Sequence, residues 1–308
     1  MPGMRNISMR QLQIFACAAR HLSFSRASEE LHLTQPAVSM QIRQLEGSAG
    51  LPLFDRLGRR LHLTQAGEEV LRHAQQALLA IRNAEDALVA LKSLTGGRIT
   101  IAVVSTAKYF APKLIALFRE RHPDVGMKLA VNNREAVVQH LTANEVDLAI
   151  MGQPPRALEA EAAVFARHPL VIISAPGHPL AARKRVALKT VAQQPFLVRE
   201  PGSGTRSAME HFFRERGLQF RIDMEMDSNE TIKQAVMAGM GVSFISQHTI
   251  GLELATGQLV MLKVEGLPVL RQWHVVHLKD KRLSPAAQAF KAFMLEEGRA
   301  FLKLWPGG

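Results

Sequence analysis

The sequence predicts an α/β protein in which an N-terminal winged helix-turn-helix, a long linker helix and a C-terminal region of two α/β subdomains follow one another. Three observations favour this fold class. Short amphipathic helical patterns and a basic hairpin fill residues 1–66, and an unbroken helical pattern then extends almost to residue 95. Strand and helix patterns alternate beyond residue 97. We therefore expect domains over residues 1–66, 67–96 and 97–308.

Composition places the chain among soluble globular proteins. It has 308 residues and 47% hydrophobic residues, enough to bury a sizeable core. No stretch approaches about 18 consecutive apolar residues, so we expect no membrane span. The first residues lack the apolar run of a secretory signal, and the single cysteine, Cys17, forms neither an intramolecular disulfide nor a zinc cluster. These features predict a cytoplasmic protein.

The stretch FSRASEELHLTQPAVSMQIR, residues 24–43, is typical of a DNA-binding helix-turn-helix. A first helix over about residues 9–20 precedes it, and a short second helix begins after Ser23. Thr34 follows a tight turn and is placed to cap the third helix, because its hydroxyl can accept a backbone N–H of the first turn. Pro36 falls within that turn, where its missing N–H costs nothing.

The third helix has an inward apolar face and an outward mixed face. Val38, Ile42 and Leu45 recur at i, i+4 and i+7, as expected for packing on the preceding helices. The outward face carries Gln35, Pro36, Ser39, Met40 and Arg43. Amide and guanidinium groups can bond base edges, a hydroxyl can bond phosphate, and apolar atoms can contact thymine methyl groups. An ordinary helical hairpin with a solvated polar face is the alternative.

A basic hairpin, or wing, follows the helix-turn-helix. It turns around Gly58 and carries Arg56, Arg59 and Arg60. Arginines beside a recognition helix hold phosphates or enter a minor groove, although three arginines on a turn could also be a solvated surface. Residues 1–66 hold eight arginines against four acids, and the whole chain has a formal net charge of +11. This balance suits a phosphate backbone and favours DNA contact.

The linker helix is expected from Gln65 to Leu94, with Thr95-Gly96-Gly97 ending it. A heptad-like apolar stripe runs along it through Ala66, Val70, Ala74, Ala77, Ile81, Ala84, Leu88 and Leu91. Such a stripe indicates a partner helix, so we expect a homodimer whose two recognition helices lie one or more DNA turns apart. Packing of this stripe on its own domain is the alternative.

The region beyond residue 97 predicts subdomain I over 97–167 and 268–308, and subdomain II over 168–267. The chain is expected to cross between them near Phe165–Pro169 and Gly266–Arg271. Strands are expected over residues 98–104, 125–131, 147–151, 170–174, 196–199, 223–226, 242–245 and 272–277. Helices are expected over residues 109–120, 134–142, 205–216, 230–238 and 284–304. The first βαβαβ unit predicts a right-handed parallel sheet, and a ligand belongs in the crevice at the strand ends.

Hydroxyl, amide and guanidinium groups gather where strands lead into helices on both sides of this crevice. The candidate ligand-binding residues are Ser105, Thr106, Gln153, Ser203, Gly204, Thr205, Arg206 and Asn229. Free backbone N–H groups at a helix amino terminus, joined by hydroxyls and a guanidinium, form a good anion cradle. We therefore expect a small anionic ligand such as a phosphorylated sugar or a carboxylate. Ser105 and Asn229 could instead be plain helix caps.

The helix-turn-helix LTQPAVSMQIRQLE, the wing LFDRLGRRLHLTQAGE and the two-subdomain region resemble those of LysR-type transcriptional regulators over the whole chain. PGSGTR, SNETIKQAVMAGMGVSFIS, RQWHVVH and LSPAAQAF look like the regulators of Calvin-cycle carbon-fixation operons. The resemblance implies a type 2 periplasmic-binding-protein fold for the effector region. It also implies a dimer of dimers on an interrupted dyad of double-stranded DNA, upstream of a divergently transcribed operon. A metabolite would change DNA bending and activate transcription, with RNA polymerase as a further partner.

Two other classes of function have weaker support. A solute-binding or transport component could be built on the region after Gly97, but such a protein needs a secretory signal and no helix-turn-helix. An enzyme would need a catalytic constellation, and no Ser/His/Asp set is recognisable, while GSGT lacks the spacing of a nucleotide-binding P-loop. The 12 histidines show no metal-ligand spacing. We therefore expect neither an enzyme nor a metal or organic cofactor.

Overall fold

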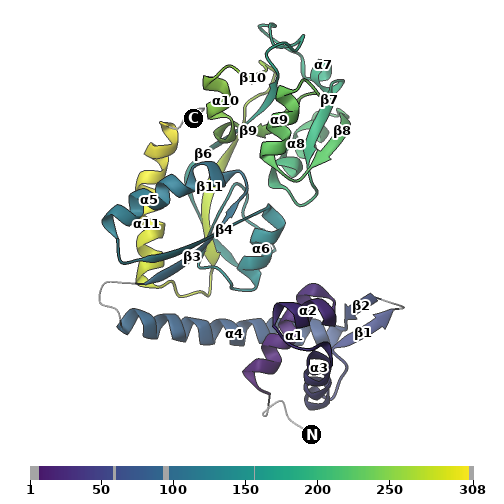
Figure 1. Ribbon diagram of the computed structural model, residues 1–308, viewed down its shortest axis with the longest axis vertical. Helices are drawn as coiled ribbons and strands as arrows, with labels where there is room; N and C mark the ends of the chain where they lie inside the picture. The colour runs from purple at the N-terminus through teal and green to yellow at the C-terminus, as the bar shows by residue number, and fades with distance from the viewer. Residues whose placement is uncertain (1–6, 58–59, 93–96, 156, 305–308) are drawn as a thin grey trace. The chain divides into compact units, whose positions relative to one another are not determined.

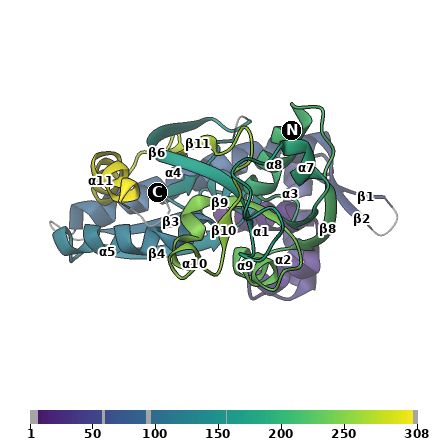
Figure 2. The same cartoon turned by 90° about the horizontal axis from the view of Figure 1, so that it is seen from above.

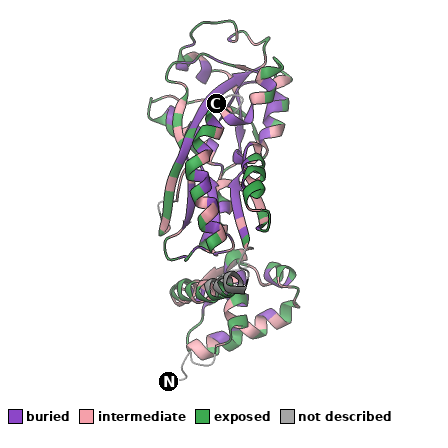
Figure 3. Ribbon diagram, turned by 90° about the vertical axis from the view of Figure 1, so that its left-hand side faces the viewer, coloured by how far each residue is buried: buried purple, intermediate pink, exposed green. Residues whose placement is uncertain are grey.

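The computed structural model describes residues 7–57, 60–92, 97–155 and 157–304 (Figure 1). The chain divides into two compact units, residues 1–88 and 89–308. Buried residues, purple in Figure 3, follow the strands and the inward faces of the helices, whereas the outer helix faces are exposed. Within the described residues, no helix is both long enough and apolar enough to cross a membrane.

The N-terminal unit is a winged helix-turn-helix joined to a long helix. Its elements are α1 (Met9–His21), α2 (Phe24–Glu30), α3 (Gln35–Ala49), β1 (Phe54–Leu57), β2 (Arg60–Leu63) and α4 (Gln65–Lys92). The Thr34 hydroxyl caps α3 as the sequence predicts, accepting the backbone N–H of Ala37. The Ser23 hydroxyl caps α2 by accepting the backbone N–H of Arg26. His32 forms the tight turn between them with a left-handed φ of 53°. The three helices share one core around Phe15, as expected.

The two halves of α4 have different surroundings. Ala66, Val70 and Ala74 pack against the core of the N-terminal unit, so the first part of the apolar stripe is used within the chain. Ile81 and Leu88 further along are 46% and 58% exposed. At Gly67 the helix passes so close to the carbonyl oxygen of Leu53 that a Cβ atom would lie 2.0 Å from it. Glycine is therefore required where α4 leaves the wing.

The C-terminal unit begins with the parallel sheet that the βαβαβ pattern predicts. Strands β3 (Arg98–Val104), β4 (Gly126–Asn132) and β5 (Leu148–Met151) pair in parallel with β3 in the middle. Helices α5 (Ala111–Arg121) and α11 (Pro285–Lys303) lie on one side of this sheet, and α6 (Arg134–Thr142) lies on the other (Figure 1). This arrangement forms subdomain I around one buried apolar cluster.

Subdomain II contains strands and helices that flank a second and a third apolar cluster. Its elements are α7 (Leu188–Ala192), β7 (Pro195–Arg199), α8 (Gly204–Arg214), β8 (Arg221–Met226), α9 (Asn229–Met237), β9 (Ser243–Ser246), η3 (Gln247–Thr249), α10 (Gly251–Ala255) and β10 (Val260–Met261). The sequence interpretation missed α7, α10, β10, η3 and the short η2 (Ala107–Tyr109) before α5. Elements of two to five residues are too short to display a helical or alternating period.

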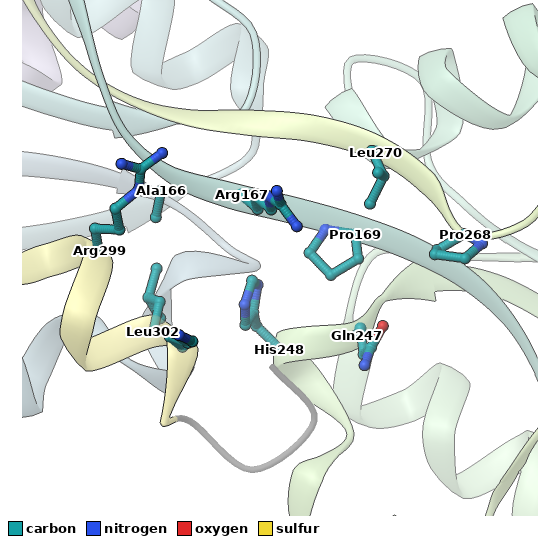
Figure 4. A pocket seen from close by; sticks show the side chains of 10 residues that line it. Ala166, Arg167, Pro169, Gln247, His248, Pro268, Leu270, Arg299 and Leu302 are labelled. Atoms are coloured by element: carbon teal, nitrogen blue, oxygen red, sulfur yellow. The ribbon is translucent and has the colours of Figure 1, made fainter.

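Two long antiparallel strands connect the subdomains. β6 (Ala160–Ser174) and β11 (Val269–Leu278) pair along ten positions and lie side by side in Figures 1 and 2. The prediction that a strand begins only at Leu170 was wrong. Residues 160–169 carry alanines, charged groups and a proline rather than an apolar run, so their pairing with β11 holds them extended. Both strands continue through the crossing from one apolar core to the next, and Figure 4 shows this crossing from close by.

A buried aromatic group fills the crossing. The His168 ring stacks on Trp273, with ring centroids 3.9 Å apart and planes 17° apart. Trp273 Nε1 donates a hydrogen bond to His248 Nδ1 at 3.2 Å. Burial lowers the pKa of His168 well below its ordinary value, with smaller effects from His248, Arg271 and His274. Burial also lowers the pKa of His248 to about 4, so both rings are neutral near pH 7.

This neutral pair predicts a loss of stability in mild acid. Because the folded-state pKa of His248 is below its unfolded value near 6.5, the unfolded chain binds more protons below that pH. Full stability is present above pH 6.5, and His248 alone removes about 2 kcal/mol by pH 5. Urea unfolding at pH 7 and pH 5 should show this loss, and H248Q should reduce it. An equal loss in both proteins would contradict the assignment.

Candidate functional site

The outward face of α3 forms an open groove. Its lining residues, which surround about 530 Å³, are Gln35, Pro36, Ser39, Met40, Arg43 and Gln44. Five of these six are the residues predicted to face DNA. Met40 is 52% exposed although the helix buries its other large apolar side chains, which suits contact with an apolar base group. Gln44 was missed, and it accepts a hydrogen bond from Gln11 of α1 at 3.3 Å between Nε2 and Oε1.

The wing is tied to the recognition helix by a carboxylate. Glu46 Oε1 accepts the backbone N–H groups of Leu53 at 2.9 Å and Phe54 at 3.2 Å. The predicted hairpin is present, with β1 and β2 paired antiparallel. Arg56 lies in β1 and Arg60 in β2, whereas Gly58 and Arg59 lie outside the described residues. A groove and a basic hairpin on one small core can bind a duplex through base edges and backbone together.

The crevice between the subdomains contains a small closed cavity of about 30 Å³. It is lined by Val104, Ser105, Thr106, Arg134, Gly152, Gln153, His168, Leu170, Ser203, Gly204, Thr205 and Arg271. Six of the eight residues predicted from sequence therefore surround one cavity. The amino-terminal turn of α8 forms one wall, with the Ser203 hydroxyl accepting the backbone N–H of Arg206 as its cap. Free N–H groups at this end favour a negative charge.

Two guanidinium groups that the sequence interpretation missed stand at this cavity. Arg134 opens α6, and its Nε donates to the carbonyl oxygen of Gln153 at 3.1 Å. Arg271 lies in the crossing part of β11 and donates to Gln153 Oε1 at 2.5 Å and to the carbonyl of Gly204 at 3.4 Å. The sequence signal that could have identified Arg271 is its charge, because it lies in a segment expected to cross between the subdomains. Arg134 reaches the cavity only through tertiary folding.

The cavity wall carries positive charge. Among the described residues that line it, two are arginines and none has a carboxylate. Burial lowers the pKa of both guanidinium groups, and the neighbouring charge of Arg134 lowers that of Arg271 further. Both stay protonated near pH 7, since the ordinary pKa of arginine is far above neutrality. A bound anion would relieve this repulsion and accept the available N–H donors.

Arg206 and Asn229 do not line the cavity. The guanidinium of Arg206 pairs with Glu210 at 2.8 Å and with Glu225, and it donates to the carbonyl of Arg199 at 2.9 Å. Asn229 is buried, and its Oδ1 accepts from Arg199 Nη1 at 2.8 Å. The same Nη1 donates to Ser105 Oγ at 3.0 Å. Asn229 therefore orients the arginine that holds Ser105, and Arg206 faces away.

The cavity is closed by contacts between the subdomains. The backbone N–H of Glu135, in the first turn of α6, donates to the carbonyl of Gly202 at 3.2 Å. The Arg199–Ser105 bond also joins one subdomain to the other. A volume of 30 Å³ accommodates about one or two water molecules, so a larger ligand requires the crevice to widen.

One group of possible metal ligands occurs among the described residues. The ligand atoms of Cys17, His21 and Glu30 lie within 4.8 Å of one another. The Arg20 guanidinium pairs with Glu30 and lies 3.8 Å from Cys17 Sγ. A cation already occupies this position, and burial raises the pKa of the thiol, so these side chains are poorly suited to hold a second cation.

Comparison with known proteins identifies both units. Residues 9–68 match the model of the bacterial regulatory helix-turn-helix of the lysR family, and residues 92–299 match the LysR substrate binding domain. The chain is 52% identical over 292 residues to a RuBisCO operon transcriptional regulator of Allochromatium vinosum, covering 95% of this chain and 97% of that protein. It is 49% identical over 305 residues to the transcriptional regulator CfxR of Cupriavidus necator, covering 99% and 96%.

A solved structure supports the same assignment for the C-terminal unit. The regulatory domain of CcmR from Synechocystis, determined in complex with 2-PG (2-phosphoglycolate), aligns with a TM-score of 0.63 and 37% identity. It covers 65% of this chain and 96% of that domain. The helix-turn-helix groove, the two-subdomain cavity and these matches agree. The chain belongs to the LysR family of DNA-binding transcriptional regulators, which carry an effector-binding domain and are not enzymes.

Proposed function

We propose that this regulator controls a RuBisCO operon in response to a small anionic metabolite bound between its two subdomains. The observation that carries the ligand class is the pair Arg134 and Arg271 beside the amino terminus of α8, in a cavity whose described lining residues include no carboxylate. The operon is inferred from relatives about half identical over nearly the full length. The complex of the CcmR domain with 2-phosphoglycolate favours a phosphorylated carboxylate.

The ligand would bind at the residues that converge on the cavity. Hydroxyls of Ser105, Thr106, Ser203 and Thr205, the α8 backbone at Gly204 and the Gln153 amide would supply hydrogen bonds. Arg134 and Arg271 would neutralise the anionic groups, and His168 would present a neutral ring. Arg206 and Asn229 would not contact the ligand directly, because neither residue lines the cavity, and the Arg206 guanidinium and Asn229 Oδ1 bond to protein atoms. An anion in the widened crevice would replace the repulsion between the two guanidinium groups with attraction.

The DNA-binding half would act as a pair. We infer that residues 1–66 bind half of an interrupted dyad through Gln35, Pro36, Ser39, Met40 and Arg43, with Arg56, Arg59 and Arg60 on phosphates or in a minor groove. Residues 67–96 would join two copies, since Ile81 and Leu88 of α4 are exposed apolar side chains in one chain. Residues 97–308 would bind the effector. Two dimers would form the tetramer in the cytoplasm, and RNA polymerase would be contacted at the promoter.

An arginine substitution in the cavity tests the ligand class. R271A should lower the affinity of the full-length protein for 2-phosphoglycolate by about tenfold to a hundredfold, because a charge-assisted hydrogen bond contributes about 1.5–3 kcal/mol. R206A is the matched control, since its guanidinium is already paired with Glu210 and Glu225. Isothermal titration calorimetry measures both. Equal losses in R271A and R206A, or no binding to the unmodified protein, would overturn the cavity assignment.

Two arginine substitutions separate base recognition from backbone binding. R43A should relax base preference at its position by about 1–3 kcal/mol, since Arg43 lies exposed in the α3 groove. R59A should weaken binding to all sequences and flatten the dependence of affinity on salt. Gel-shift titrations with matched and scrambled operators at several salt concentrations measure these effects. The same uniform weakening in both variants would show that α3 does not read bases.

A further inference from the structure

Two side-chain amides connect the start of α1 to the groove on α3. The backbone N–H of Ser8, just before α1, donates to Gln11 Oε1 at 2.9 Å. Gln11 Nε2 then donates to Gln44 Oε1 at 3.3 Å, from one helix to the other. Gln11 is itself held in a capping box, because its backbone N–H donates to the Ser8 hydroxyl at 3.2 Å. A helix cap is therefore bonded, through one side chain, to a residue that lines the groove.

These hydrogen bonds determine which end of each amide faces its neighbour. A side-chain amide has an acceptor oxygen at one end and two N–H donors at the other. The backbone N–H of Ser8 can only donate, so it binds the oxygen of Gln11 and leaves the NH2 group of Gln11 for Gln44. Because that NH2 group can only donate, it holds the oxygen of Gln44 towards α1. The NH2 group of Gln44 is the end that is left for the groove.

Gln44 extends the row of groove residues by one turn of α3. Pro36, Met40 and Gln44 are spaced four residues apart, so they are neighbours on one face of the helix. All three line the groove, and the side chain of Gln44 is exposed. Gln44 therefore belongs to the surface that, under the proposed function, faces the base edges of the major groove.

We propose that Gln44 reads one base pair of each half-site as a hydrogen-bond donor only, and that Gln11 is the positioning residue that sets this polarity. The inference rests on the proposed placement of α3 in a major groove. There, guanine offers the acceptors O6 and N7 and thymine offers O4, whereas adenine N6 and cytosine N4 are donors. Gln44 should therefore prefer guanine or thymine on the strand that it contacts. The two-bond contact of a glutamine with adenine would require the oxygen that Gln11 holds.

Binding selection on random duplex DNA tests this polarity without knowledge of the operator. Full-length protein is equilibrated with the library, and the bound fraction is sequenced. One position in each half-site should show guanine and thymine together preferred over adenine and cytosine. The preference should be about tenfold, equivalent to about 1.4 kcal/mol, because the wrong base leaves a donor facing a donor.

Q11E should reverse the preference although Gln11 does not line the groove. The carboxylate that it introduces still accepts the N–H of Ser8, because a capping box takes either Glu or Gln. It has no donor for Gln44, so it should bind the NH2 group of Gln44 and turn the oxygen of Gln44 outward. Adenine and cytosine should then be preferred at the same position. Q44E should give the same reversal, since a carboxylate only accepts.

Q13E is the matched control for the added negative charge. Gln13 is exposed on the same helix, and its side chain accepts from Arg10 at 3.5 Å rather than bonding to α3. Q13E should weaken binding to all sequences alike, because its charge repels the phosphate backbone, and it should leave the base preference unchanged. Thermal unfolding of Q11E and Q13E at equal temperatures checks that both variants keep the fold of the N-terminal unit.

The variants separate failure of the inference from failure of the proposed function. If R43A alters the base preference while Q11E and Q44E alter no position, α3 reads bases but Gln44 does not. A reversal in Q44E without one in Q11E would contradict the positioning role of Gln11. The same uniform weakening in Q11E as in Q13E would show an effect of charge alone. If no variant changes any preference, R43A included, the proposed role of α3 fails and the inference fails with it.

Discussion

The antiparallel pairing of β6 with β11 is the constraint on which the rest of the C-terminal unit depends. These strands are the covalent and hydrogen-bonded connection between the two subdomains, and they pair from Val269–Leu170 to Leu278–Ala160. Both strands contribute to the cavity between the subdomains, through His168 of β6 and Arg271 of β11. Because the two strands pair with each other, we expect a movement that widens the crevice to bend or shift this pair.

Two positively charged side chains in the cavity between the subdomains favour a bound anion. Arg134 and Arg271 face one cavity in which no described lining residue has a carboxylate, and hydrogen bonds to Gln153 hold them there. An anion between them would relieve their mutual repulsion, but an anion larger than one or two water molecules requires the crevice to widen. The Glu135–Gly202 and Arg199–Ser105 bonds join subdomain I to subdomain II in the present arrangement. The ligand can bias the two arrangements only by the difference between its affinities for them.

Local patterns predicted most of the fold, and they did so where the cause of the structure is local. Thr34 caps α3 as expected because a cap needs only its own first turn, and the parallel β3, β4 and β5 follow from the βαβαβ order. The first ten residues of β6 were missed because a partner strand, rather than an apolar run, keeps them extended.

In the site, strand-to-helix junctions identified Ser105 and Thr205. The positions of Arg134 and Arg271 at the cavity depend on tertiary folding. Glu210, four residues after Arg206 on the same helix, is the sequence signal that Arg206 is paired.

The central claim is that an anion in the subdomain cavity changes how the N-terminal unit engages DNA. Footprinting of the full-length protein on the intergenic DNA beside its own gene, with and without 2-phosphoglycolate, tests it most directly. The account predicts protection of an interrupted dyad in both conditions, with the ligand altering the extent of protection or the bend of the DNA. R271A should protect the dyad and show no ligand effect at the same concentration. A ligand effect that survives unchanged in R271A, or the absence of any protected dyad, would contradict the account.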